Sequence, residues 1–139
     1  MNAIRPLTLA VAYIVTAVAM LAVDSVWLIT MSERLYKPLL GPILAPQFAL
    51  APAIAFYVIY VAGLVALAVV PGISSGSPMR ALRNGAILGF TAYATYDLTN
   101  QATLTHWSTV LTLADMCWGT ILSGFAASIG AVAGIRLRR

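Results

Sequence analysis

Residues 7–30 read LTLAVAYIVTAVAMLAVDSVWLIT, a run in which Asp24 is the one charged side chain. A helix needs about 20 mostly apolar residues to cross the hydrocarbon core of a bilayer. The run is too long and too continuous for a strand of a membrane barrel, which would alternate over roughly 10 residues. It also continues past any plausible cleavage site of a signal peptide, although Arg5 precedes it. It therefore predicts a membrane-spanning helix.

The rest of the chain has the same apolar character. Of its 139 residues, 61% are hydrophobic and 9% are charged, whereas soluble domains carry about 25% charged residues. The first span is expected over residues 7–30. Further apolar runs at about residues 50–70, 81–101 and 109–135 predict three more spans. Short connections make sequential helices antiparallel. The predicted fold is an all-α integral membrane four-helix bundle, with one domain over residues 1–139.

Proline and glycine predict where the helices end. Pro71-Gly72 is expected to stop the second span, because proline lacks the N–H that the helix needs. Residues 32–47 contain Pro38, Pro42 and Pro46, and we expect a stiff, largely non-helical crossing there.

The basic residues predict the orientation. One side of the predicted bundle holds six of them and the other holds two, so the first side is expected to be cytoplasmic, with both termini. The six are Arg5, Arg80, Arg83, Arg136, Arg138 and Arg139, and the two are Arg34 and Lys37. The net charge of +4 does not indicate a nucleic-acid partner, because these residues lie at the ends of apolar segments.

Three of the four acidic residues, Asp24, Asp97 and Asp115, fall inside predicted spans. An ionisable group within a membrane helix is costly and is a functional hypothesis by default. Counted from the middle of each span at about 1.5 Å per residue, the three lie about 8–10 Å toward the outer side. We therefore expect them to share one level and one site.

Aromatic residues fall at the same level. Trp27 follows Asp24 by three residues, and Trp118 follows Asp115 likewise, so each pair lies on one helix face. The predicted site is an outward-facing pocket that binds a ligand. It comprises Asp24, Trp27, Tyr57, Tyr60, Tyr93, Tyr96, Asp97, Asn100, Asp115 and Trp118.

Several occupants of this site remain open. No lysine or arginine lies deep in a span, so the three neighbouring carboxylates will not all ionise. Their charge can be balanced by protons, by an organic cation, or by a hard metal held with His106. No motif identifies a cofactor, and a single histidine gives little support for a zinc or haem site. Alternatively, the acids only fix helix packing. Asp115 would then bond to Thr112, Asp24 to Ser25 or a tyrosine hydroxyl, and Asp97 would lie near a helix end beside Asn100.

Four segments together resemble a family of small bacterial membrane proteins, domain of unknown function 2177. They are Tyr93-Ala-Thr-Tyr-Asp-Leu-Thr-Asn-Gln-Ala-Thr-Leu104, Asp24-Ser-Val-Trp27-Leu, Phe56-Tyr57 with Tyr60 and Gly63, and Asp115-Met-Cys-Trp118-Gly119. The resemblance covers nearly the whole chain. It implies four helices in the bacterial inner membrane, and it implies no activity.

Three functions fit the sequence. The first is binding or transport of a small cation or amphiphile. The second is a membrane enzyme acting on a lipid or isoprenoid, with an aspartate as general acid or base. The third is an accessory subunit of a larger complex. The GxxxG pairs Gly85/Gly89 and Gly130/Gly134 indicate close helix contacts, either within one chain or in a homodimer.

Overall fold

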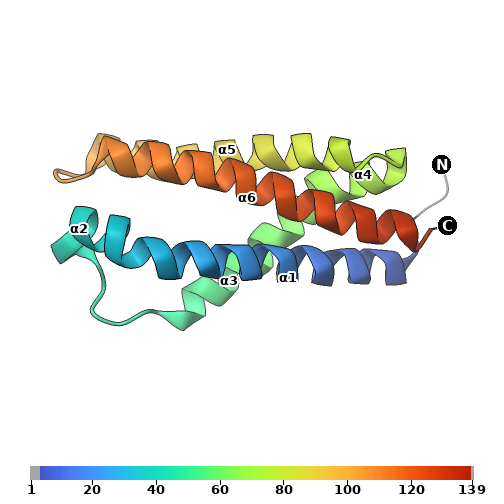
Figure 1. The fold of residues 1–139 in the computed structure, drawn as a ribbon, viewed down its shortest axis with the longest axis horizontal. Coiled ribbons are helices and arrows are strands. Elements are labelled where there is room, and N and C mark those ends of the chain that lie inside the picture. Colours follow the sequence, from blue (N-terminus) through green and yellow to red (C-terminus); the bar gives the residue numbers. More distant parts are fainter. Residues whose placement is uncertain (1–3, 139) are drawn as a thin grey trace.

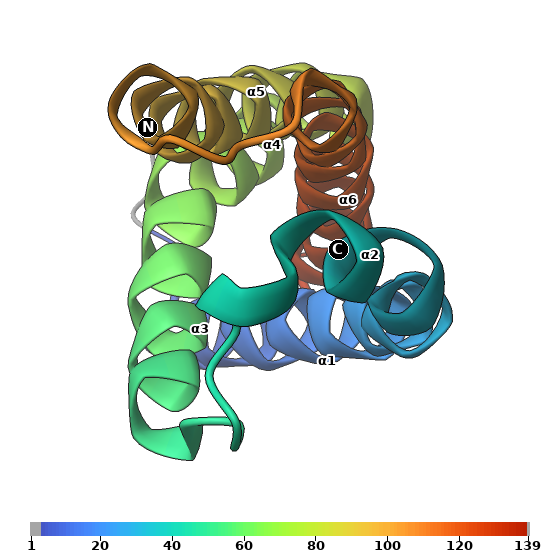
Figure 2. The same ribbon diagram turned by 90° about the vertical axis from the view of Figure 1, so that its left-hand side faces the viewer.

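The computed structural model describes residues 4–138, apart from the side chain of Pro42, and its regular structure is entirely helical. Figure 2 shows four long helices at the corners of a square: α1 (Pro6–Met31), α3 (Leu50–Leu64), α5 (Pro78–Thr103) and α6 (Thr109–Arg136). Short segments extend two of them. These are η1 (Ser32–Tyr36), α2 (Lys37–Leu40) and η2 (Gly41–Ile43) after α1, and η3 (Val65–Val69) and α4 (Val70–Ser75) after α3. The prediction of an all-α fold is confirmed.

Three helical stretches are long and apolar enough to cross a membrane: Pro6–Leu40, Leu50–Ser75 and Thr109–Arg136. Large apolar side chains on them are exposed, among them Ile14, Ile59 and Ile121, as expected for a surface that faces lipid. The predicted span over 81–101 forms a helix, α5, but it is more polar than the other three and is not among these stretches.

Pro38 and Pro71 do not end their helices, contrary to the prediction from the sequence. Each is preceded by a π turn: η1 ends two residues before Pro38, and η3 ends two residues before Pro71. In a regular α-helix the proline ring clashes with the carbonyl four residues earlier, and a wider π turn changes that spacing. As a result α1 continues through α2 to Leu40, and α3 continues through α4 to Ser75. The expected non-helical crossing is limited to residues 44–49.

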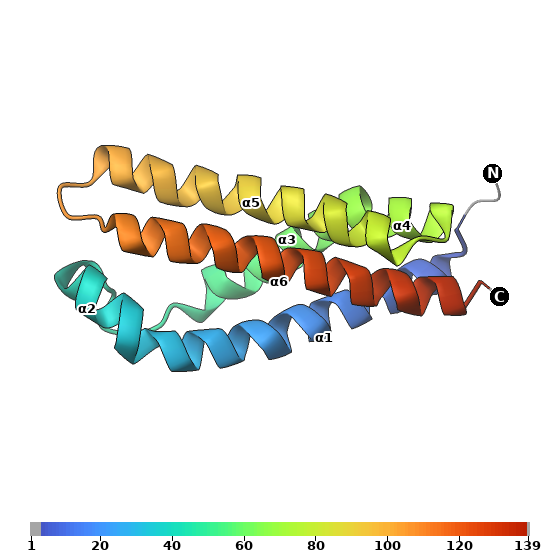
Figure 3. The same ribbon diagram turned by 45° about the horizontal axis from the view of Figure 1, so that its top comes forward.

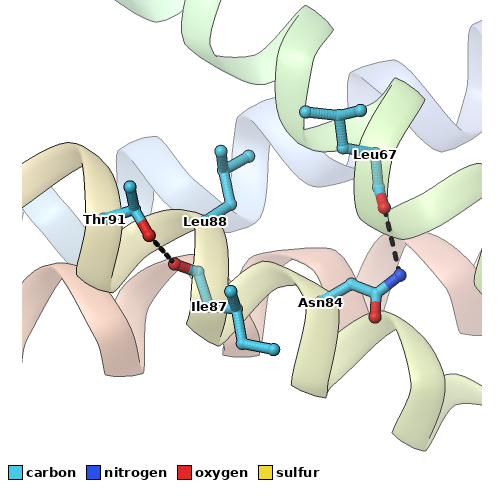
Figure 4. Close-up of a pocket in the computed structure, with 5 residues that line it drawn as sticks. All are labelled: Leu67, Asn84, Ile87, Leu88 and Thr91. Carbon is cyan, nitrogen blue, oxygen red and sulfur yellow. Dashed lines mark hydrogen bonds between the residues drawn. The ribbon is translucent and has the colours of Figure 1, made fainter.

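A side chain from α5 compensates for the second proline. In a regular helix the Leu67 carbonyl would accept the N–H of residue 71, which is proline and has none. The Asn84 side-chain amide donates to this carbonyl instead, at 3.1 Å, across a hollow also lined by Ile87, Leu88 and Thr91 (Figure 4). This bond joins η3 to α5.

α5 and α6 lie side by side along their whole length (Figures 1 and 3). Glycine permits the approach: a Cβ on Gly89 would lie 2.2 Å from the Gly119 carbonyl oxygen, and one on Gly85 would lie 2.6 Å from that of Ser123. In the second pair, a Cβ on Gly130 would meet Thr16 of α1 at 2.0 Å. Both GxxxG pairs thus contact helices of the same chain, while a homodimer remains a prediction.

α3 is packed less closely. It is inclined to α5, so that the two helices meet at η3 and separate toward the start of α3 (Figures 1 and 2). In the stretch from Leu50 to Ser75 the buried side chains, such as Val61, Leu64 and Val69, all lie beyond residue 60. The first half of α3 therefore lies farther from α5 than its second half does.

Candidate functional site

The carboxylates of Asp24 on α1 and Asp115 on α6 are buried and hydrogen-bonded. The Tyr57 hydroxyl of α3 donates to Asp24 Oδ2 at 2.5 Å, and the Trp118 indole N–H of α6 donates to Asp24 Oδ1 at 2.9 Å. The Tyr36 hydroxyl of η1 donates to Asp115 Oδ1 at 2.6 Å. The alternative that Asp24 bonds a tyrosine hydroxyl is confirmed. The Asp115–Thr112 bond is not formed, because the Thr112 hydroxyl donates to Gln101.

Across the α1–α6 contact, the tryptophan of each Asp-x-x-Trp sequence is hydrogen-bonded, directly or through Tyr36, to the aspartate of the other. Trp118 donates directly to Asp24, whereas Trp27 donates to the Tyr36 hydroxyl at 3.0 Å, which in turn donates to Asp115. The two indole rings stack with centroids 4.3 Å apart and planes 9° apart. Antiparallel helices carrying the same sequence pattern thus form a reciprocal, roughly two-fold arrangement. We call Asp24, Trp27, Tyr36, Tyr57, Asp115 and Trp118 the aspartate–tryptophan network.

Tyr36 is the member of this network that sequence reasoning misses. It lies nine residues after Trp27, which is about 2.5 turns of an α-helix and would place it on the opposite face. The π turn η1 changes the register between them, and the two side chains then meet. No pattern in the sequence reports this shift, because residues 32–47 read as a loop.

Asp97 on α5 has the opposite environment. It is 0% exposed, and neither of its carboxylate oxygens has a hydrogen-bond partner among the described residues. The prediction that Asp97 is buried among protein groups is confirmed. An unpaired carboxylate in such surroundings is costly unless a proton or a cation accompanies it.

An aromatic pocket of about 400 Å³ lies where α3 and α5 separate, and Phe56, Tyr60, Ala92, Tyr93 and Tyr96 line it. The Tyr60 hydroxyl is held by the Ser123 hydroxyl at 2.7 Å. Tyr93 rests on α6, since a Cβ on Gly119 would lie 2.1 Å from its ring. Asp97 follows Tyr93 by four residues and so lies one turn farther along the same face of α5.

Eight of the ten predicted site residues fall into two groups. Asp24, Trp27, Tyr57, Asp115 and Trp118 belong to the aspartate–tryptophan network. Tyr60, Tyr93 and Tyr96 line the aromatic pocket.

Asp97 and Asn100 belong to neither group. Asn100 is half-buried near the end of α5. No three His, Cys, Asp or Glu side chains within residues 4–138 are grouped so as to hold a metal ion. His106 is exposed in the connection before α6.

Comparison with known families agrees with this architecture. Residues 9–132 match the family described as "Predicted membrane protein (DUF2177)". The chain belongs to this family. It is thus a membrane protein, in agreement with the three apolar helical stretches, and the family description names no activity. No curated protein and no solved structure matches the chain.

Proposed function

We propose that this family member is a bacterial inner-membrane protein that binds an amphiphilic molecule with a cationic head group. Asp97 accepts the head group, and the aromatic pocket between α3 and α5 takes the adjoining apolar part. The observation that carries the proposal is the full burial of Asp97 with both carboxylate oxygens unpaired, one turn from the pocket residue Tyr93.

The chemistry around Asp97 favours a cation. Among the described residues, the ion pair is formed by Lys37 and Glu33 on an exposed turn. Asp97 has no basic partner there. A protonated amine donates to carboxylate oxygens in charge-assisted bonds, which are roughly twice as strong as neutral ones. The ring faces of Phe56, Tyr60 and Tyr93 also attract cations. A neutral amphiphile would use the pocket but leave the carboxylate unpaired.

The proposal includes α5 as the fourth span of a transmembrane bundle. Thr91, Thr95, Thr99 and Thr103 recur every four residues, and each hydroxyl donates to the carbonyl four residues earlier. A hydroxyl satisfied within its own helix is tolerated in lipid far better than a free one. These bonds explain how a helix with an exposed threonine row can lie in the bilayer.

We propose that both termini and the α4–α5 turn are cytoplasmic, because arginines are concentrated on the cytoplasmic side of membrane proteins. Reporter fusions at Ser75 are expected to read cytoplasmic, and fusions at Pro42 periplasmic. The reverse result at both positions would overturn the orientation and the outward-facing pocket.

Ligand binding is tested in lipid nanodiscs with dodecylamine as the probe and dodecanol as its neutral counterpart. Trp107 reports binding by its fluorescence, because its ring centroid lies 5.8 Å from that of the pocket residue Tyr96. Dodecylamine is expected to bind more tightly than dodecanol. Asp97→Asn is expected to weaken the amine by at least about tenfold, the factor for loss of a hydrogen bond to a charged group.

The matched control is Glu33→Gln, which removes an exposed acid and is expected to bind dodecylamine as the parent does. An Asp97→Asn protein that folds and binds the amine equally well would refute the role of Asp97. Equal affinity for dodecanol and dodecylamine would refute the cationic head group.

A further inference from the structure

The charges of this chain are separated along the length of the molecule. The start of α1, the start of α5 and the end of α6 lie at one end (Figure 1). This end carries the arginines 5, 80, 83, 136 and 138, whereas the four acids lie in the other half of the molecule. Arg139 lies outside the described residues. No described acid therefore neutralises this arginine end.

A hollow at the arginine end brings one guanidinium next to apolar side chains. It has a volume of about 180 Å³ between the α4–α5 turn and the end of α6, and Gly76, Pro78, Val132, Ile135 and Arg136 line it. Within residues 4–138 the Arg136 side chain makes no hydrogen bond or ion pair. This arginine is available to an external anion.

Arg138, near the same hollow, is bonded to the backbone of α4. Its guanidinium donates to the Ile73 carbonyl at 3.2 Å and so fastens the end of α6 to α4. This bond holds the two sides of the hollow together. Arg80 and Arg83 are exposed on the first turns of α5.

From this geometry we infer that the hollow binds the phosphate of an anionic phospholipid, with Arg136 as its main contact. A guanidinium matches the geometry of a phosphate, to which it can donate two parallel hydrogen bonds. Val132 and Ile135 supply an apolar wall beside it, which suits the start of an acyl chain and offers nothing to a free phosphate ion. Basic pockets between helices on the cytoplasmic side of a membrane are suited to such head groups. This inference does not depend on Asp97.

The test compares phosphatidylglycerol with phosphatidylcholine, added to the detergent-purified full chain, with native mass spectrometry and thermal unfolding as readouts. Phosphatidylglycerol is expected to be retained and to raise the Tm more than phosphatidylcholine, since a ligand of the folded state stabilises it. Arg136→Gln is expected to weaken its binding about fivefold, the factor that corresponds to about 1 kcal/mol per basic residue at an anionic surface.

Arg34→Gln is the matched control, because Arg34 is exposed at the opposite end of the molecule. It is expected to bind phosphatidylglycerol as the parent does. An equal loss in Arg34→Gln and Arg136→Gln would show diffuse attraction and overturn the site. Equal stabilisation by both lipids would overturn the preference for an anion, and equal stabilisation by soluble glycerol phosphate would overturn a lipid as the occupant.

Discussion

Asp24 and Asp97 are both buried aspartates in the same half of the molecule, yet their surroundings differ. Asp24 accepts hydrogen bonds from Tyr57 and Trp118, which belong to two other helices. Asp97 accepts none from any described residue. A carboxylate whose partners come from neighbouring helices holds those helices together, and a carboxylate without partners is available to something else. The same residue type thus serves packing in one position and ligand binding, as we propose, in the other.

The largest effect on stability is expected for Asp24→Ala. It leaves the Tyr57 hydroxyl and the Trp118 indole N–H as buried donors without an acceptor, and the expected loss of unfolding free energy is about 2–4 kcal/mol. Titration with a denaturing detergent measures it. Asp24→Asn, which keeps one carbonyl oxygen as acceptor, is expected to lose about half as much; equal losses would contradict the hydrogen-bond explanation.

Gly119→Ala is expected to cost about 1–3 kcal/mol through overpacking. The added Cβ would lie 2.1 Å from the Tyr93 ring, which has to move toward the aromatic pocket. Both the Tm and dodecylamine binding should therefore fall. Gly63→Ala on α3 is the control, because its Cβ meets nothing within 4 Å, and it is expected to leave stability unchanged or higher. Normal binding by Gly119→Ala would show that Tyr93 does not shape the pocket.

Tyr36→Phe tests the link that the sequence did not reveal. It removes the hydroxyl that accepts from Trp27 and donates to Asp115, at an expected cost of about 1–2 kcal/mol. The change should also alter the fluorescence of the stacked tryptophans. Tyr13→Phe removes a more exposed hydroxyl bonded to the Val58 carbonyl and is expected to cost less. If the two losses are equal, Tyr36 has no special place in the network.

The smallest change in stability is expected for Asp97→Asn. No hydrogen bond to a described residue is lost, so the unfolding free energy measured without ligand should change by less than about 1 kcal/mol. Set beside Asp24→Ala, this variant sharpens the contrast between a structural and an unpaired carboxylate. A loss as large as that of Asp24→Ala would mean that Asp97 also holds helices together.

The sequence by itself determined the helical fold, the membrane environment and the burial of Asp97. Long apolar runs have few alternatives in lipid, because each backbone polar group must be bonded within its own segment. It also drew attention to the paired Asp-x-x-Trp patterns. The predicted helix ends near Pro38 and Pro71 were wrong, because π turns before these prolines extend α1 to Leu40 and α3 to Ser75.

Only the tertiary structure decided which acid is partnered. The residues bonded to Asp24 and Asp115 are separated from them by 33, 79 and 94 positions in the chain. Such contacts depend on how three helices are rotated about their axes, and a single π turn before Tyr36 changes that rotation. A residue pattern records the face on which a side chain lies within one regular helix. It does not record which donor from another helix reaches that face, and this difference separates Asp24 from Asp97.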